Sequence, residues 1–436
     1  MTYNPRLIKI ITLGCAKNLV DSERLMQQLQ AAGFHVRHSD HAAGAKTVLI
    51  NTCGFINDAK EESVNTILSV IAAKKRGGVE RIFVFGCLSQ RYRHELQQEL
   101  PEVDRFFGVE EFDKIVETLG GVPSPKYLTR RAIATPPHYA YLKISEGCNW
   151  GCAYCAIPLI RGKHRSTPVE QLVVETKLLA ARGVKELLIT AQDTTYYGID
   201  LYGYRRLPGL LTALSEVKGI EWIRLHYAYP AQFPEDVLPV MRDNPKLCKY
   251  LDIPLQHISG KVLKNMRRGI NSRQTRALVE KLRAEIPGIA LRTTLIVGHP
   301  GEDDAAFREL EDFVEETRFE RLGVFCYSEE EGTYGAQHFT DTIPDREKQA
   351  RRDRIMSLQA RISQQLNEEK IGKTFRTLID RQEDGYCAGR TQYDTPEVDG
   401  EVLVSTANNA LQPGKFYDVL ITAAETYDLF GSYSAP

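Results

Sequence analysis

Short apolar runs alternate with segments of helical spacing through the first quarter of the chain. The apolar runs lie at 7–13 (LIKIITL), 47–52 (TVLINT) and 81–86 (RIFVFG). Between them, 21–33 and 58–78 have apolar residues at helical intervals, and Asp21 is the expected N-cap of the first helix. Strands that are apolar on both faces and separated by helices are typical of parallel sheets. The sequence therefore predicts a doubly wound α/β domain over 1–125.

A second series of strand and helix patterns follows two stretches of linker type, at 120–125 and 135–137. Its strands are expected at 139–145, 185–191, 222–227, 249–254, 290–297 and 321–327. Six strand–helix units are fewer than the eight that close a TIM barrel. We therefore expect an α/β fold of the partial (β/α)6, TIM-like type over 135–370, in which 345–370 forms a long charged connecting helix.

The remaining residues, 371–436, contain short strand patterns separated by Gly, Pro and Asn, which predict a small all-β barrel. A chain of 436 residues is too long for one ordinary core, in agreement with three domains. We find no apolar run of membrane-spanning length and no secretory signal pattern, so a cytoplasmic protein without membrane contacts is expected. The net charge of −1 gives no overall attraction to nucleic acid, although it leaves local patches open.

Each of the first three strands is followed directly by a cysteine, at Cys15, Cys53 and Cys87. Taken singly, such a cysteine is most often a small apolar filler. Successive parallel strands, however, end at one edge of the sheet, so the three thiols are expected to point into one crevice and to share a metal cluster. The isolated Cys248, Cys326 and Cys387 are assigned to packing.

Three more cysteines, Cys148, Cys152 and Cys155, lie on one short segment just after a predicted barrel strand. A disulfide is disfavoured in the cytoplasm and would leave one thiol over. Zinc would need a fourth ligand; His164 is available, but neighbouring basic side chains oppose a cation there. An iron–sulfur cluster held by three thiolates, with one iron left open, fits the spacing better.

The segment CNWGCAYC (148–155) resembles the Cys-x3-Cys-x2-Cys signature of radical S-adenosylmethionine enzymes, including the aromatic Tyr154. The whole chain resembles the methylthiotransferase family, which has a three-cysteine N-terminal domain, a radical barrel and a C-terminal TRAM-type domain. The matching stretches are 157–166, 191–198, 252–269 and 293–302.

By this resemblance, Cys148, Cys152 and Cys155 hold a catalytic [4Fe-4S] cluster whose free iron chelates S-adenosylmethionine, the source of a deoxyadenosyl radical. Cys15, Cys53 and Cys87 would hold a second [4Fe-4S] cluster, which carries the sulfur for the product. An electron donor such as flavodoxin or ferredoxin would reduce them.

The resemblance also implies roles for residues beside the cysteines. Tyr154 would pack near the adenine, and Gln192 and Asp193 would bind the methionine end of S-adenosylmethionine. The alternatives are a core aromatic for Tyr154 and a capping pair for Gln192 and Asp193.

Other polar side chains near strand ends and on the cysteine loop are less specific. Four basic side chains follow the cysteines closely: Arg161, Lys163, His164 and Arg165. They either contact the substrate or the surroundings of a cluster, or belong to a solvated loop. The histidines His226, His257 and His299 are assigned structural roles.

Two branches of the family differ in substrate: one modifies a tRNA adenosine, the other the β-carbon of an aspartate in the twelfth small-subunit ribosomal protein. AQDTTYYG (191–198) resembles the ribosomal-protein branch, whereas the tRNA branch resembles Gly-Gln-Asn-Val-Asn there. Residues 371–436 also contain 5 Lys and Arg against 10 Asp and Glu, including Asp380, Glu383 and Asp384. Such a domain would repel RNA and attract a basic protein, unless it is an ordinary acidic surface. A ribosomal protein is therefore the favoured substrate and tRNA the runner-up; a non-catalytic metal protein that binds the ribosome is the alternative of another class.

Overall fold

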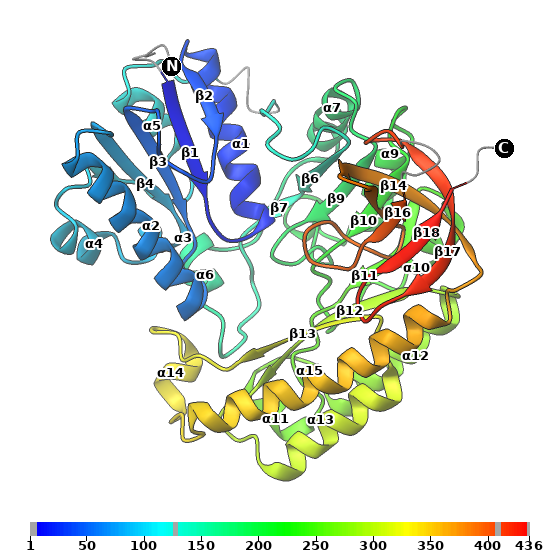
Figure 1. Ribbon diagram of the computed structural model, residues 1–436. Coiled ribbons are helices and arrows are strands. Elements are labelled where there is room, and N and C mark those ends of the chain that lie inside the picture. The colour runs from blue at the N-terminus through cyan, green and yellow to red at the C-terminus, as the bar shows by residue number, and fades with distance from the viewer. Residues whose placement is uncertain (1–6, 125–129, 406–410, 434–436) are drawn as a thin grey trace.

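The computed structural model describes residues 7–124, 130–405 and 411–433, so Pro125 of the expected linker lies outside the described residues. Three β-structures, each with its own apolar core, make up the described part of the chain (Figure 1). They are a parallel sheet, a larger parallel barrel and a small closed barrel, so the predicted fold class is confirmed. No helix in these ranges is both long and apolar enough to cross a membrane.

The N-terminal sheet has five parallel strands in the order β2-β1-β3-β4-β5. They are β1 (Leu7–Thr12), β2 (His35–His38), β3 (Thr47–Thr52), β4 (Arg81–Gly86) and β5 (Arg105–Phe106). The three predicted strands are confirmed, whereas β2 and β5 are too short to give a clear apolar pattern. Since the connection reverses between β1 and β3, a crevice is expected where the carboxyl ends of these two strands diverge.

Helices cover both faces of this sheet, α1 and α5 on one and α2 and α4 on the other. The helices are α1 (Ala16–Ala31), α2 (Asn57–Lys75), α3 (Cys87–Arg91), α4 (Arg93–Glu99) and α5 (Phe112–Thr118). The prediction that Asp21 caps the first helix is wrong, because α1 begins at Ala16 with Cys15 at the N-cap. Asp21 lies inside the helix, 3% exposed, and forms ion pairs with Lys143 and Arg161 of the central barrel. These partners in the central barrel explain why an acidic residue occupies a buried position in the middle of α1.

The central barrel is an open sheet of six parallel strands in the order β13-β12-β11-β10-β9-β6, as predicted. The strands are β6 (Tyr139–Lys143), β9 (Glu186–Thr190), β10 (Trp222–Leu225), β11 (Leu247–Asp252), β12 (Ala290–Val297) and β13 (Arg321–Cys326). A two-stranded hairpin, β7 (Ser145–Glu146) with β8 (Arg165–Ser166), stands beside β6 and encloses the segment with Cys148, Cys152 and Cys155.

Apolar side chains of the outer helices and the strands share one continuous core. The helices of this part are α6 (Ile157–Arg161), α7 (Val169–Ala180), α8 (Ile199–Tyr202), α9 (Leu207–Ser215), α10 (Val237–Asp243), α11 (Gly260–Asn265), α12 (Ser272–Glu285), α13 (Asp304–Thr317), α14 (Tyr334–His338) and α15 (Asp345–Glu368). The long helix α15 packs along β13 and α13 and leads into the third β-structure.

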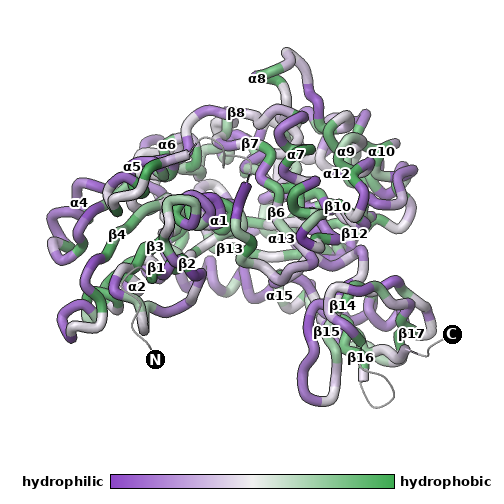
Figure 2. Tube along the Cα trace, turned by 90° about the horizontal axis from the view of Figure 1, so that it is seen from above, coloured by the Kyte–Doolittle hydropathy of each residue, from purple (hydrophilic) through white to green (hydrophobic). Residues whose placement is uncertain are grey.

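The C-terminal barrel is closed, with strand order β14-β15-β16-β18-β17. Its strands are β14 (Thr374–Glu383), β15 (Tyr386–Thr391), β16 (Val402–Ser405), β17 (Phe416–Ala424) and β18 (Leu429–Ser432). Figure 2 shows it standing to one side of the other two structures.

Several acidic side chains of the C-terminal barrel are used internally rather than displayed to a partner. Asp399 accepts a hydrogen bond from Tyr250 at 2.9 Å, and Asp394 pairs with Arg321. Asp380, expected on an acidic surface, has only 11% of its side chain exposed and lies between His138 at 2.8 Å and Arg390 at 2.6 Å. The inference that the acidic balance of this domain serves a partner is therefore wrong for Asp380, because this carboxylate holds the C-terminal barrel to the central one.

Candidate functional site

The three strand-end cysteines meet at one edge of the N-terminal sheet. Cys15 follows β1, Cys53 follows β3 and Cys87 follows β4, and these strands are neighbours. The first two flank the point at which the strand order reverses, where open α/β sheets bind ligands. Gly14 adopts φ +87°, and a Cβ there would lie 2.8 Å from the Cys53 sulfur, so the loops after β1 and β3 approach closely.

The electrostatic environments of these thiols differ. Burial raises the pKa of Cys53 to about 12 and also raises that of Cys87. Burial acts in the same direction on Cys15, but Lys17 and the first amides of α1 outweigh it, so the pKa of Cys15 is lowered. A bound metal supplies the positive charge that would keep the buried thiols of Cys53 and Cys87 ionised, and the thiolate form of Cys15 is already favoured, so this donor set fits an iron–sulfur cluster.

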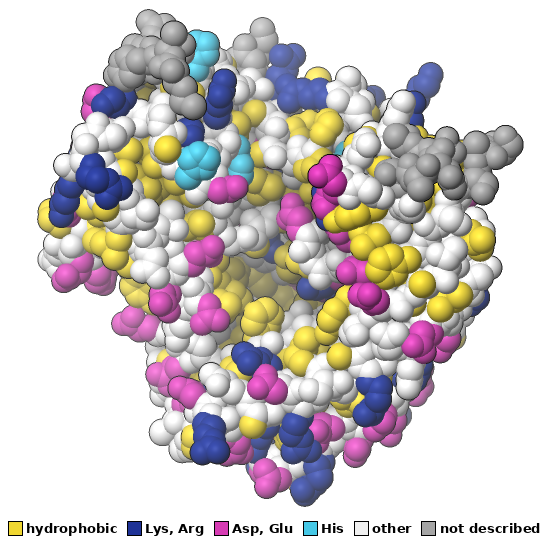
Figure 3. All heavy atoms as spheres, viewed as in Figure 1, with side chains coloured by type: hydrophobic (Ala, Val, Ile, Leu, Met, Phe, Trp, Pro, Cys, Tyr) yellow, Lys and Arg dark blue, Asp and Glu magenta, His cyan; other side chains and the backbone are white. Residues whose placement is uncertain are grey.

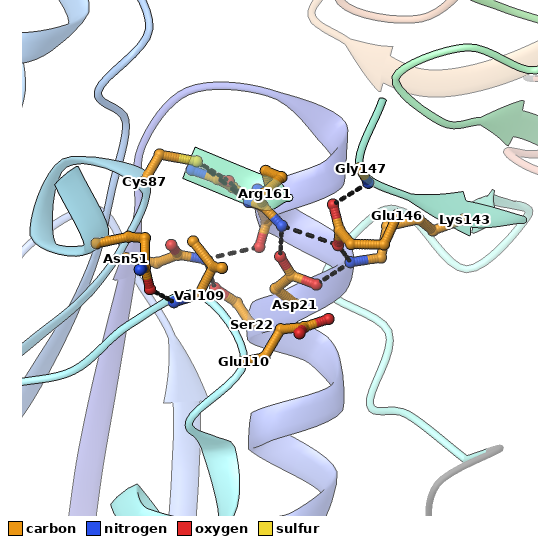
Figure 4. Close-up of polar contacts among 12 residues, drawn as sticks. Asp21, Ser22, Asn51, Cys87, Val109, Glu110, Lys143, Glu146, Gly147 and Arg161 are labelled. Atoms are coloured by element: carbon orange, nitrogen blue, oxygen red, sulfur yellow. Dashed lines mark hydrogen bonds and ion pairs between the residues drawn. The ribbon is translucent and has the colours of Figure 1, made fainter. Parts of the chain in front are cut away.

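Cys87 is also contacted by polar side chains from both sides of the domain boundary (Figure 4). Arg161 of α6 donates to the Cys87 sulfur at 3.2 Å, and the Cys87 thiol lies 3.5 Å from Asn18 Oδ1. Asn18 donates in turn to the carbonyls of Leu13 at 2.9 Å and Thr52 at 3.2 Å. The loops after β1 and β3 are thereby joined beside the cysteines.

The second group of cysteines lies on the single loop between β7 and α6. Gly147 begins the loop with φ +76°, and a Cβ there would lie 2.2 Å from the Lys163 carbonyl oxygen. The amide of Cys148 donates to Gly162 O at 3.1 Å, and that of Cys155 to Cys152 O at 3.1 Å. Burial raises the pKa of Cys148 to about 12 and also raises that of Cys155. The loop is thus folded back on itself, and burial disfavours the thiolate forms of Cys148 and Cys155 unless a bound metal supplies positive charge.

Three side chains that sequence reasoning missed surround this loop. Trp150 stacks on Tyr229 with ring centroids 4.1 Å apart, and the Tyr229 hydroxyl lies 3.3 Å from the Cys152 sulfur. Buried Arg268 donates to the Cys152 sulfur at 3.4 Å and to the Tyr154 hydroxyl at 3.2 Å. Arg268 lies within the stretch 252–269, but no local pattern there indicates that its side chain reaches a cysteine.

The residues expected to contact S-adenosylmethionine lie close to this loop. Gln192 follows β9 and donates to Glu146 at 2.6 Å, while its own amide oxygen is buried without a hydrogen-bond partner in the described part of the chain. Asp193 accepts from Trp150 at 2.6 Å and from the Thr195 amide at 2.8 Å, so it has the capping contact considered as its alternative role. The Tyr154 ring packs against an apolar cluster of Val262, Met266 and Ala306.

The remaining candidates have ordinary structural partners. His226 bonds Thr395 at 3.1 Å, His257 bonds Glu302 at 3.2 Å, and His299 lies 3.1 Å from Pro300 O. Of the basic run, Arg161 and His164 are both buried at 4% exposed, whereas Arg165 is exposed and pairs with Glu110. The solvated-loop interpretation is therefore wrong for Arg161 and His164.

Helix α6 separates the two groups of cysteines. Its residues Ala156, at the N-cap, and Ile160 pack against Cys87 and Val109 of the N-terminal domain. The helix begins two residues after Cys155, so the end of one cysteine segment leads directly into the helix that packs against a cysteine of the other group. The space-filling view shows the surface hollowed between the N-terminal domain and the central barrel (Figure 3).

Neither group resembles a site for a single metal ion. In residues 7–124, 130–405 and 411–433, no three His, Cys, Asp or Glu side chains converge closely enough to hold one ion. The ligands of a zinc site all bind one ion, whereas the thiolates of a four-iron cluster attach to separate irons.

Family models match all three parts of the chain. They are the radical SAM superfamily over residues 142–314, an uncharacterised family designated UPF0004 over 7–108, and the TRAM domain over 371–433. Among solved structures, the chain is similar to the radical S-adenosylmethionine methyltransferase TsrM from Kitasatospora setae, with a TM-score of 0.55, 14% identity and coverage of 74% of this chain and 75% of that one. At this identity the likeness extends to the fold alone.

Curated relatives match over nearly their whole length. A ribosomal protein uS12 methylthiotransferase RimO from Phocaeicola vulgatus is 52% identical over 98% of both chains. The protein of the same name from Porphyromonas gingivalis is 52% identical, over 97% of this chain and 98% of the relative. That from Bacteroides thetaiotaomicron is 51% identical, over 97% of each chain. The chain belongs to the RimO family of radical S-adenosylmethionine methylthiotransferases.

Proposed function

We propose that this protein adds a methylthio group to the β-carbon of an aspartate in ribosomal protein uS12. The observation that carries the proposal is the identity of about half of all residues, over nearly full length, with relatives named for this activity. The two groups of three cysteines support it, because a methylthio transfer needs both a radical source and a sulfur source.

Each group of cysteines is assigned one task. Cys148, Cys152 and Cys155 would hold a [4Fe-4S] cluster whose open iron binds S-adenosylmethionine. Cys15, Cys53 and Cys87 would hold a second [4Fe-4S] cluster. When bound, these groups supply a radical that removes a hydrogen from the substrate carbon and a sulfur that replaces it.

The protein's own side chains would bind and orient S-adenosylmethionine beside the cysteine loop. Gln192 offers a buried amide oxygen that lacks a partner among the described residues, which suits a donor such as the ammonium group of the methionine end. Asp193 is fixed by Trp150 at 2.6 Å, and Tyr154 stands beside Arg268 at 3.2 Å, on the side proposed for the adenine. The stacked rings of Trp150 and Tyr229 would exclude water from the radical.

The choice of a protein substrate over tRNA rests on the family and on the stretch 191–198. The acidic composition of the C-terminal barrel supports a basic protein partner less than its sequence suggested. The reason is that Asp380, Asp394 and Asp399 already pair with residues of this protein. A ribosomal protein as substrate agrees with the expected cytoplasmic location, where flavodoxin or ferredoxin could supply electrons.

The test is a reaction of the anaerobically reconstituted protein with S-adenosylmethionine, a reductant and sulfide. Purified uS12, small ribosomal subunits and tRNA are offered in parallel. We expect uS12, free or assembled, to gain the mass that corresponds to exchange of one hydrogen for a methylthio group, at an aspartate. Modification of tRNA adenosine alone, or a preparation that contains zinc and no sulfide, would contradict the proposal.

A further inference from the structure

Arg161 is the one side chain of the polar network in Figure 4 that reaches from the central barrel to a cysteine of the N-terminal domain. It stands at the end of α6, six residues after Cys155, and is 4% exposed. One terminal nitrogen, Nη1, contacts Asp21 at 2.7 Å and Glu146 at 3.0 Å. The other, Nη2, contacts Asn18 at 2.6 Å and the Cys87 sulfur at 3.2 Å.

The charges in the buried group around Arg161 are balanced before any charge on Cys87 is counted. Lys143 contacts Asp21 and lies 2.7 Å from Glu146, so two cations face two carboxylates within this buried group. A thiolate at Cys87 would add a negative charge, and among the described residues Arg161 is the cation that contacts this sulfur, through Nη2 at 3.2 Å. In iron–sulfur proteins, hydrogen bonds to the ligand sulfurs and nearby positive charge raise the reduction potential of the cluster.

The same network continues to the side of the barrel proposed for S-adenosylmethionine. Gln192 donates to Glu146 Oε1 at 2.6 Å, and Glu146 accepts from Arg161 through its other oxygen at 3.0 Å. Three successive hydrogen bonds therefore connect Gln192 with the Cys87 sulfur. Such a network fixes the geometry of both ends only while every member is paired.

We propose that Arg161 is a positioning residue for the cluster on Cys15, Cys53 and Cys87: it donates to the Cys87 sulfur, raises the reduction potential of that cluster and fixes it relative to the barrel. The proposal rests on the second cluster of the proposed function. Arg161 is assigned no contact with the substrate; it acts through Cys87.

A purely structural role predicts something different. Lys143 also joins the two domains through Asp21 and Glu146, and no contact between it and a cysteine is found in the described residues. If Arg161 served only to join the domains, its loss and that of Lys143 would have similar consequences. If Arg161 acts through its hydrogen bond to the Cys87 sulfur, its loss should lower the reduction potential of the cluster more than the loss of Lys143 does.

The experiment isolates the N-terminal cluster. In a variant with Cys148, Cys152 and Cys155 all changed to Ala, the remaining iron and sulfide are counted and the cluster is titrated potentiometrically, with its paramagnetic resonance signal as readout. Arg161→Gln is compared with Lys143→Gln and with Arg165→Gln. The last is a matched control, because Arg165 is exposed, pairs only with Glu110 in the described contacts and loses the same charge.

We expect Arg161→Gln to retain its iron and to titrate at a clearly lower potential than the parent, with a smaller shift for Lys143→Gln and none for Arg165→Gln. Arg161→Lys, which keeps the charge without the forked contacts, should lie between the parent and Arg161→Gln. In the protein with all its cysteines, Arg161→Gln should slow methylthio transfer several-fold more than cleavage of S-adenosylmethionine.

If Arg161→Gln does not fold, the double variant Arg161→Gln with Asp21→Asn removes one buried charge of each sign and leaves Lys143 with Glu146. The lowered potential is expected there as well. A potential equal to that of the Arg165→Gln control, with iron retained, would overturn the role of Arg161 and leave the proposed function intact. A parent that binds no iron would overturn both.

Discussion

The two cysteine sites of this protein are built in opposite ways. The barrel site takes Cys148, Cys152 and Cys155 from one loop, which is folded back on itself and also bonded through Ala153 to Met266 and Gly335. The N-terminal site takes Cys15, Cys53 and Cys87 from the ends of three strands and exists only when β1, β3 and β4 pair. The ligands of a cluster site made from one loop can be recognised from their spacing in the sequence, whereas the ligands of a site made from three strands are brought together only by the fold.

The largest effect should follow from Cys152→Ala, which breaks the barrel site alone. Two thiolates cannot hold the cluster and keep one iron open, so cleavage of S-adenosylmethionine should be abolished. The N-terminal cluster should remain, because its ligands lie in another domain. Deoxyadenosine release and iron content measure the two outcomes; undiminished deoxyadenosine formation would refute the assignment of the barrel site.

The opposite substitution, Cys53→Ala, should separate the two sites chemically. Deoxyadenosine formation should persist nearly unchanged, while transfer of the methylthio group to uS12 should fall to background. The reason is that radical formation needs only the loop cysteines, whereas sulfur is held by the strand-end cysteines. Full product formation by this variant, measured by mass spectrometry, would show that Cys53 is a packing residue.

Gly14→Ala should sharpen the contrast, because it tests whether the N-terminal site depends on close backbone approach. A Cβ at this position would lie 2.8 Å from the Cys53 sulfur, so the variant should lose most of the iron of that site and keep the barrel iron. Gly33→Ala is the matched control, with the same φ of +87° and nothing within 4 Å. Both variants should lose about 1 kcal/mol of stability from the left-handed backbone, but only Gly14→Ala should lose iron. Equal iron contents would argue against a strand-end cluster.

The comparison also explains how much of the molecule could be predicted from its sequence. The parallel strands and the local cysteine motif were predictable, because apolar runs and short spacings are properties of contiguous residues. The sequence pattern predicts a helix cap at Asp21 and leaves two interpretations open for Arg161, because the environment of each is determined by a partner in another domain. The expectation of an exposed Asp380 is wrong for the same reason: its partner His138 is distant in the sequence, and an ion pair between distant residues leaves no local pattern.

The smallest effect on the two sites is expected from Asp380→Asn, which acts on the attachment of the C-terminal barrel. Burial alone would raise the pKa of Asp380, but Arg390 and His138 hold it at about 2. Because the pKa is lower in the folded state, this carboxylate contributes about 2 kcal/mol of stability at neutral pH, lost as the pH falls from about 4 toward 2. Asp380→Asn leaves Arg390 short of a buried partner and should lower the free energy of unfolding by roughly 3 kcal/mol.

Denaturant unfolding of the wild type and Asp380→Asn over this pH range measures the difference. The variant should lack the acid dependence that Asp380 gives the wild type, and its iron content should stay that of the wild type. A variant as stable as the wild type at neutral pH would show that the contact with His138 and Arg390 does not hold the barrels together. Loss of iron in the variant would mean that the cysteine sites depend on the C-terminal barrel, against the comparison drawn above.

The most direct test of two separate cluster sites is the iron and sulfide content of three reconstituted proteins. These are the wild type, a variant with Cys15, Cys53 and Cys87 changed to Ala, and a variant with Cys148, Cys152 and Cys155 changed to Ala. The wild type should bind about eight irons with as many sulfides, and each variant about four. A wild type with only about four irons, or a variant that keeps the full wild-type content, would contradict the account of two independent clusters.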